Sequence, residues 1–75
     1  MTSTEKRYMV RCYTPGGDLG RVFYATTLKE AETIRRAWAD DFEIDERRQF
    51  AYMPTIWKRD PESTAYGGYR RLLDY

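Results

Sequence analysis

The chain has 75 residues, of which 41% are hydrophobic, and its formal net charge is +1. A chain of this length forms one domain and buries only about 60% of the surface that its unfolded form exposes. The apolar content argues against disorder, because disordered chains lack the side chains whose burial offsets the entropy of ordering. Cys12 is the only cysteine, which excludes an intramolecular disulfide and argues against a cysteine zinc site.

The hydropathy of the sequence predicts the cellular localisation of the protein. No apolar run approaches the roughly 20 residues that cross a bilayer. The polar first residues, MTSTEKR, lack the apolar core of a signal peptide. We therefore expect a soluble, cytoplasmic protein without a membrane partner.

The first regular pattern is an alternation over residues 7–13, RYMVRCY, which predicts a β-strand. Tyr8, Val10 and Cys12 fall on one side of this strand, which we expect to face the core. Residues 14–20, TPGGDLG, form a cluster of turn formers, because proline presets its own φ and glycine accepts a positive φ. The chain is therefore predicted to enter a hairpin.

A second strand is predicted over residues 21–26, RVFYAT, which are rich in β-branched and aromatic side chains. We expect Phe23 and Ala25 to point into the core and Val22 and Tyr24 to point away from it. The two strands would then share one apolar face.

Residues 27–42, TLKEAETIRRAWADDF, predict an amphipathic helix of roughly four turns. Thr27 and Glu30 have the spacing of a capping box, in which two side chains satisfy amide donors that the first turn leaves unpaired. One apolar stripe follows at spacings of three and four: Leu28, Ala31, Ile34, Trp38 and Phe42. The outer face, which we expect to be solvated, carries Lys29, Glu32, Arg35, Arg36 and Asp40.

The remainder of the chain predicts a third strand and one more short element. Residues 48–59, RQFAYMPTIWKR, alternate, and their core side is predicted to carry Phe50, Tyr52 and Ile56. Because Pro54 has no amide hydrogen for a ladder, we expect an edge strand or a bulge there. The last residues form a short strand, a helical turn or a docked tail.

The predicted fold class is α+β: a small antiparallel sheet of three to four strands with one amphipathic helix packed on one face. The element order is β-β-α-β plus a C-terminal segment. We expect a single domain over residues 1–75, with residues 1–5 disordered and residues 61–75 as a tail or fourth element. Many unrelated domains share this plan, so it does not identify a function.

The sequence argues against catalysis and metal binding. It contains no histidine, which removes the commonest general base and metal ligand. Cys12 lies among alternating apolar residues and is predicted to be a buried, inert thiol. The glycine-rich turn lacks the Gly-Lys-Ser/Thr ending of a phosphate-binding loop, and the acidic residues lack EF-hand spacing. We expect no enzyme activity, no cofactor and no metal site.

The first candidate surface is an acidic patch where the helix is predicted to end. The summed charge is +3 over residues 1–39, −5 over residues 40–46 and +3 over residues 47–75. Carboxylates beside a helix C-terminus oppose its dipole, at a cost of about 0.3–1 kcal/mol each at low salt. The patch is either a solvated turn or a contact surface for a basic partner. It consists of Asp40, Asp41, Glu43, Asp45 and Glu46.

The second candidate surface is the sheet face turned away from the helix. Arg together with Tyr, Trp and Met is typical of interface hot spots and of platforms for single-stranded nucleic acid. Its predicted members are Met9, Arg11, Tyr13, Tyr24, Met53, Trp57 and Arg59. In the alternative, the C-terminal segment covers this face with Tyr66, Tyr69, Leu72 and Leu73.

The function predicted first is that of a non-catalytic protein-binding module, an inhibitor or adaptor of phage or mobile-element type that contacts a larger host complex. The alternative is a single-stranded nucleic-acid-binding module that uses the Arg and aromatic side chains of the sheet face, with Arg7. The near-neutral net charge and the acidic patch weigh against the alternative, because both weaken attraction to phosphate. A homodimer through an edge strand or the aromatic face is compatible with either.

Overall fold

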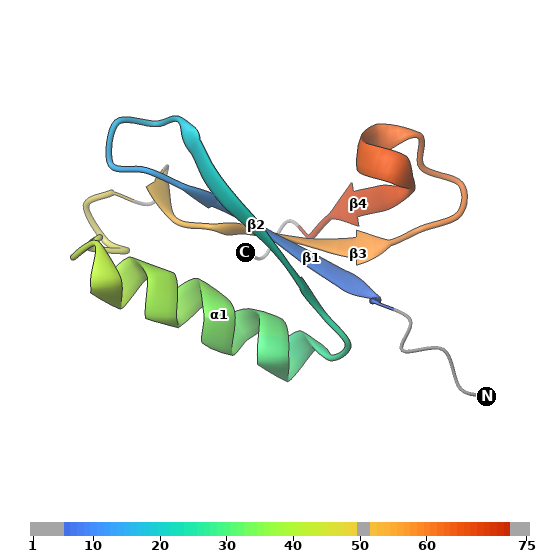
Figure 1. Cartoon of the computed structure of the whole chain (residues 1–75), viewed down its shortest axis with the longest axis horizontal. Coiled ribbons are helices and arrows are strands. Elements are labelled where there is room, and N and C mark those ends of the chain that lie inside the picture. The colour runs from blue at the N-terminus through green and yellow to red at the C-terminus, as the bar shows by residue number, and fades with distance from the viewer. Residues whose placement is uncertain (1–5, 50–51, 73–75) are drawn as a thin grey trace.

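The computed structural model describes residues 6–49 and 52–72 (Figure 1). The expected disorder of residues 1–5 lies outside this described part. The elements are β1 (Tyr8–Tyr13), β2 (Leu19–Ala25), α1 (Leu28–Asp41), β3 (Thr55–Arg59), the 3-10 turn η2 (Ala65–Gly67) and β4 (Tyr69–Arg71). Within the described residues, one α-helix and a four-stranded antiparallel sheet confirm the predicted α+β class.

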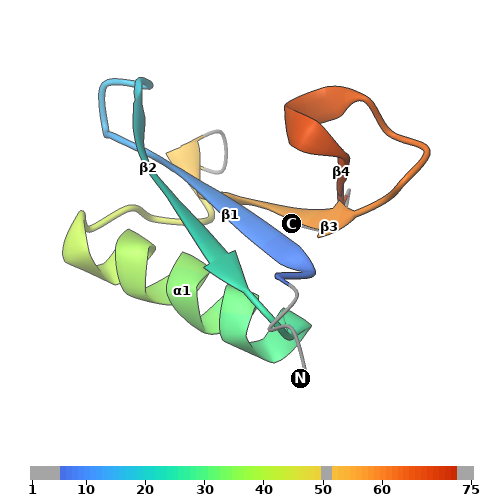
Figure 2. The ribbon, with the colours of Figure 1, turned by 45° about the vertical axis from the view of Figure 1, so that its right-hand side comes forward.

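The strands are ordered β2-β1-β3-β4, so β1 and β3 are interior and β2 and β4 are the edges. Val10 of β1 lies opposite Phe23 of β2 and Ile56 of β3. Because opposite residues of antiparallel strands share a face, this register confirms the predicted core side of β1 and β2. α1 crosses that face, as Figures 1 and 2 show.

The β1–β2 hairpin is tighter than predicted, and β2 begins two residues earlier, at Leu19. The Thr14 amide donates to the Asp18 carbonyl at 2.7 Å, which closes the turn. The pairing shifts register between Cys12 and Tyr13. A Cβ added to Gly20 in this irregular part would lie 3.1 Å from the Trp38 ring, so the close approach of β2 to α1 favours glycine there.

The start of α1 follows the predicted capping, with one difference. The Thr27 hydroxyl oxygen accepts a hydrogen bond from the Glu30 amide at 3.2 Å, as an N-cap side chain does. The Glu30 carboxylate accepts from the hydroxyl of Thr26 at 3.0 Å, one residue before the cap. The carboxylate therefore ties the helix to the end of the hairpin.

The core lies between the sheet and α1. Its buried centre consists of Val10, Cys12, Ala25, Ala31 and Ile56. A second buried cluster, formed by Ala39, Ile44 and Met53, lies at the C-terminal end of the helix. Trp38 packs against both clusters, and its indole Nε1 donates to the Tyr13 carbonyl at 2.9 Å. This one side chain joins helix, sheet and the segment after the helix.

The prediction that the third strand lies at an edge is wrong. β3 is interior, and it begins at Thr55, directly after Pro54. Pro54 therefore lies outside the strand, and the absence of its amide hydrogen removes no hydrogen bond from the sheet. Phe50, predicted to face the core, lies outside the described residues, whereas Tyr52 is 37% exposed.

The C-terminal segment forms both a helical turn and a fourth strand. β4 pairs antiparallel with β3, with Tyr69 opposite Arg59. The next residue, Leu72, packs against the main core on the helix side. In residues 6–49 and 52–72, no helix is long and apolar enough to span a membrane.

Candidate functional site

The sheet face turned away from α1, hereafter the open face, collects side chains from all four strands. Met9 lies opposite Tyr24 of β2 and Trp57 of β3, so these three side chains share this face. The predicted members that lie on it are Met9, Arg11, Tyr13, Tyr24, Trp57 and Arg59. β4 adds Tyr69 and Arg71.

Met53, which was predicted for this face, does not lie on it. The residue precedes β3, and its side chain is 5% exposed in the cluster with Ala39 and Ile44 beside the helix. The alternation that placed it with Trp57 does not extend across Pro54, because the strand begins only after the proline.

An Arg stacked on an aromatic ring lies on the open face. The guanidinium carbon of Arg11 lies 3.8 Å from the centroid of the Tyr66 ring. The same ring meets Trp57 edge to face, with 4.9 Å between the centroids. In the described part of the chain, Nε of Arg11 is buried and has no hydrogen-bond partner, so stacking positions this side chain.

The backbone of η2 adopts a rare conformation to place the Tyr66 ring. Tyr66 has φ 48° and ψ 38°, and the next two residues, Gly67 and Gly68, also have positive φ. A bulky side chain seldom occupies this region, at a cost of about 1–3 kcal/mol. Contacts with Arg11 and Trp57 offset this cost and hold the ring over the sheet.

The C-terminal segment covers only part of the open face. Tyr69 is 8% exposed, donates its hydroxyl to the Lys6 carbonyl at 2.9 Å, and contacts the Tyr24 ring. Tyr24 and Tyr66 remain 50% and 53% exposed. Of the four residues expected to cover the face, Leu72 lies on the helix side instead and Leu73 is outside the described residues. The open face is therefore partly covered, and the rings of Tyr24 and Tyr66 remain accessible to solvent.

All charged side chains within the four strands are cationic. No Asp or Glu occurs in β1, β2, β3 or β4. In contrast, the same four strands carry six cations: Arg11, Arg21, Lys58, Arg59, Arg70 and Arg71. All carboxylates of the described residues lie in α1 or in the connecting segments.

Most of these cations gather at one end of the sheet. The Arg59 amide donates to the Arg7 carbonyl at 2.7 Å, which brings the start of β1 beside the end of β3. Lys58 lies opposite Arg70. Among the described residues, the Asp60 carboxylate lies 3.6 Å from Nε of Arg70 in this group. The basic end, as we name it, consists of Lys6, Arg7, Lys58, Arg59, Arg70 and Arg71.

The acidic patch begins where α1 ends, as predicted. The Glu43 amide bonds to the Asp40 carbonyl at 3.2 Å, and the Ile44 amide bonds to the Ala39 carbonyl at 2.8 Å. These bonds form a Schellman motif, with Glu43 at φ 54° in the position that glycine usually takes. Ile44 then turns inward and packs on Ala39. The patch therefore has a buried apolar anchor between its carboxylates.

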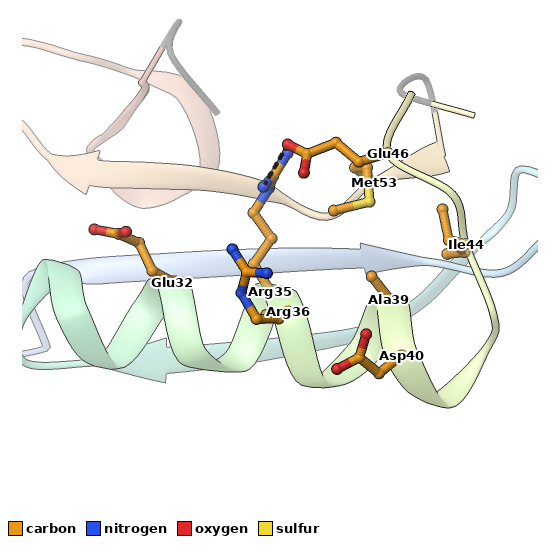
Figure 3. Close-up of a pocket in the computed structure, with 8 residues that line it drawn as sticks. All are labelled: Glu32, Arg35, Arg36, Ala39, Asp40, Ile44, Glu46 and Met53. Atoms are coloured by element: carbon orange, nitrogen blue, oxygen red, sulfur yellow. Dashed lines mark hydrogen bonds and ion pairs between the residues drawn. The ribbon is translucent and has the colours of Figure 1, made fainter. Parts of the chain in front are cut away.

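Two of the five patch carboxylates are bound within the protein. Oε1 of Glu46 lies 3.3 Å from Nη1 of Arg35, an ion pair that Figure 3 shows. Asp45 accepts a hydrogen bond from the Arg47 amide at 2.9 Å and lies 3.7 Å from Nε of Arg48. The exposed remainder of the patch is Asp40, Asp41 and Glu43, with Phe42 between them at 42% exposure.

Arg35 is the side chain beside the acidic patch whose burial sequence reasoning missed. It was predicted to be solvated, but it is 9% exposed and its Nε donates to the Pro54 carbonyl at 3.1 Å. It lines a pocket of about 310 Å³ between α1 and the segment after the helix (Figure 3). The available signal was its position four residues from both Ala31 and Ala39, because two small side chains leave room for a long one.

Replacing Glu43 by glycine is expected to raise the free energy of unfolding by about 0.5–1 kcal/mol, because glycine adopts positive φ without a Cβ clash. Urea denaturation measures the change. Glu43→Ala removes the same charge but keeps the Cβ, so the difference between the two variants isolates the backbone effect. Equal stability of the glycine and alanine variants would contradict a strained Glu43.

The Cys12 thiol is unsuited to nucleophilic chemistry. It is fully buried in the main core. Burial disfavours the thiolate and raises the pKa of Cys12 to about 12. The side chain is therefore a protonated thiol at neutral pH, as the alternation of the strand predicted.

Neither a metal cluster nor a known relative identifies the protein. Among residues 6–49 and 52–72, no group of three His, Cys, Asp or Glu side chains is arranged to hold a metal ion. In comparisons with protein-family models, with curated proteins and with solved structures, nothing matches this chain. Its function must be inferred from its own residues.

Proposed function

We propose that this protein is a non-catalytic module that binds single-stranded nucleic acid on the open face and the basic end of its sheet. One observation carries the proposal: the four strands bear six cations and no carboxylate. Phosphate contacts supply most of the affinity of such modules, and any carboxylate among the cations would oppose them.

The rings of the open face support single-stranded rather than duplex ligands. Unpaired bases stack on accessible aromatic rings, whereas paired bases are shielded within a helix. Tyr24 and Tyr66 are each about half exposed, and Arg11 lies stacked behind the second ring. A base on the Tyr66 ring, which contacts Trp57, would leave its phosphates close to Arg71, because Arg71 lies opposite Trp57 on the same face.

The acidic patch, which weighed against this function in the sequence, lies far from the basic end. Trp38, near the helix C-terminus, bonds to Tyr13 at one end of β1, whereas Lys58 lies opposite Tyr8 at the other. The two groups therefore lie toward opposite sides of the molecule along its long axis (Figure 1). At physiological salt, charges are screened over about 8 Å. Repulsion from the patch is therefore weak at the basic end.

Fluorescence anisotropy with a labelled oligothymidine, at several salt concentrations, tests the proposal. Removing two cations with Arg7→Gln and Arg71→Gln together is expected to weaken binding. It should also lower the slope of log K against log salt by about 1.4, since each phosphate contact contributes about 0.7 for single strands. The matched control, Lys29→Gln with Arg36→Gln, makes the same charge change on the exposed side of α1 and should leave the slope unchanged.

Two results would overturn the proposal. One is the absence of any anisotropy change at tens of micromolar protein in low salt. The other is an equal loss of affinity in both double variants, because this would mean that net charge alone, rather than the basic end, attracts the oligonucleotide.

A second candidate function, protein binding at the acidic patch, is favoured by a separate observation. Asp40, Asp41 and Glu43 are exposed around Phe42, which stacks on Trp38 with 4.6 Å between ring centroids. A half-exposed ring among carboxylates suits a basic protein surface with an apolar centre. If a protein captured from the native host binds the Asp40→Asn, Asp41→Asn, Glu43→Gln variant as tightly as the wild type, this second candidate fails.

A further inference from the structure

We propose that a second copy of this chain pairs with the outer edge of β2, so that two four-stranded sheets form one antiparallel sheet of eight strands. This inference is independent of the proposed function. It concerns the opposite edge of the sheet from β4 and uses none of the residues of the basic end.

The first observation is that β2 is a long edge strand with little protection. In the described part of the chain, no segment pairs with its outer side, and Figure 2 shows it as the outermost strand above α1. Proteins usually guard such edges with proline, lysine or several charges. β2 has seven residues, no proline and one charge, Arg21, and its Leu19 is 49% exposed.

The second observation is a groove beside that edge. It lies between β2 and α1 and is lined by Phe23, Ile34, Ala37, Trp38 and Asp41. Asp41 is its only charged member and is exposed at the end of the helix. A strand added to β2 would therefore place its helix-side side chains over an apolar floor with one carboxylate at its border.

The chain itself fits this edge. In an antiparallel pair related by a two-fold axis through Val22, all seven residues of β2 pair, and Arg21 of each copy lies opposite Phe23 of the other. Arg21 already lies 5.1 Å from the centroid of its own Phe23 ring, so the two side chains are compatible neighbours. Arg21 of one copy, the only cation of β2, thus reaches the groove of the other copy, where Asp41 is the only carboxylate. This charge complementarity favours a second copy of the chain as the occupant of the groove.

The helices leave room for this arrangement. The two-fold axis is perpendicular to the sheet, so both helices lie on the same side. α1 lies mainly under β1, and the two β1 strands would be three strand spacings apart, roughly 14 Å. Packed helices approach to about 8–10 Å. The Arg21 and Phe23 side chains of both copies can occupy the space between them.

Sedimentation velocity over a range of concentrations tests the pairing. The wild type is expected to approach twice the chain mass as concentration rises, and no higher mass, because a two-fold interface closes on itself. Arg21→Glu and Asp41→Arg should each raise the dimer dissociation constant about tenfold or more, since each places like charges together. The double variant Arg21→Glu with Asp41→Arg restores the opposite charges and should restore dimerisation.

The control Lys29→Glu makes the same charge reversal as Arg21→Glu on the outer side of α1 and should not change the dissociation constant. A monomeric wild type at about 0.5 mM would overturn the proposal. So would a dimer that is insensitive to Arg21→Glu, equally sensitive to Lys29→Glu, or not restored in the double variant.

Discussion

Trp38→Ala is expected to lower the free energy of unfolding by about 3 kcal/mol, the lower end of the usual cost of removing a large core aromatic side chain, because Trp38 is partly buried. The indole packs on both buried clusters, meets the Phe23 ring at 6.2 Å between centroids, and donates to the Tyr13 carbonyl. A domain of 75 residues typically has roughly 4–11 kcal/mol in total. The variant should therefore lose a large fraction of this free energy, which thermal circular dichroism and urea denaturation measure.

Trp38→Phe separates packing from the indole hydrogen bond. It keeps an aromatic ring between the clusters but leaves the Tyr13 carbonyl without the indole donor, so we expect a smaller loss of about 1–2 kcal/mol. A loss below 1 kcal/mol in Trp38→Ala would contradict the assignment of Trp38 as the side chain that joins the two clusters.

Arg35→Ala is expected to destabilise the protein by about 2–4 kcal/mol, the second largest effect. The substitution removes the donor for the buried Pro54 carbonyl, the cation beside Glu46 and the packed stem of the side chain. The segment between α1 and β3 would then lose its tie to the helix. Urea denaturation measures the loss, and hydrogen exchange of the Ile44 amide reports the local effect.

Three variants resolve what Arg35 contributes. Arg35→Met keeps an apolar stem and should cost less than Arg35→Ala, because replacing a buried ion by a hydrophobic side chain is often nearly neutral. Glu46→Gln should cost about 0.5–1 kcal/mol, since its side chain is half exposed. Arg36→Ala, at the exposed neighbouring position, should stay within about 0.5 kcal/mol of the wild type. Equal losses in Arg35→Ala and Arg36→Ala would contradict a structural role for Arg35.

The elements that the sequence predicted best are those whose signals are local. The helix follows from the spacing of Leu28, Ala31 and Trp38, and its start follows from Thr27. The facing of β1 and β2 follows from alternation, which depends only on the pleat. These features need no knowledge of distant partners, and the structure confirms them.

What could not be predicted depends on contacts between distant segments. Whether β3 is interior is decided by β4 pairing with it, and nothing in the sequence around Pro54 reports that partner. Arg35 is buried because the Pro54 carbonyl and Glu46 meet it from across the chain. Tyr66 reaches the open face through three successive residues with positive φ, a conformation that the Gly67–Gly68 pair permits but does not specify.

The candidate surfaces were predicted as sets of residue types, and the structure changes their membership. Six of the seven sheet-face residues share the open face, whereas Met53 belongs to the core. The acidic patch loses Asp45 and Glu46 to contacts within the protein. A charge count along the chain shows neither change, because it does not show which charges already have partners.

The separation of the basic end from the acidic patch gives this nearly neutral molecule an electric dipole along its long axis, which Arg47 and Arg48 beside the patch and Asp60 beside the basic end reduce. A cation-exchange resin would bind the basic end and an anion-exchange resin would bind the acidic patch. We therefore expect either resin to retain the protein, although the net charge is only +1. The same dipole orients the molecule before contact. A polyanion in solution would be approached with the β3–β4 end leading, and a polycation with the helix C-terminus leading.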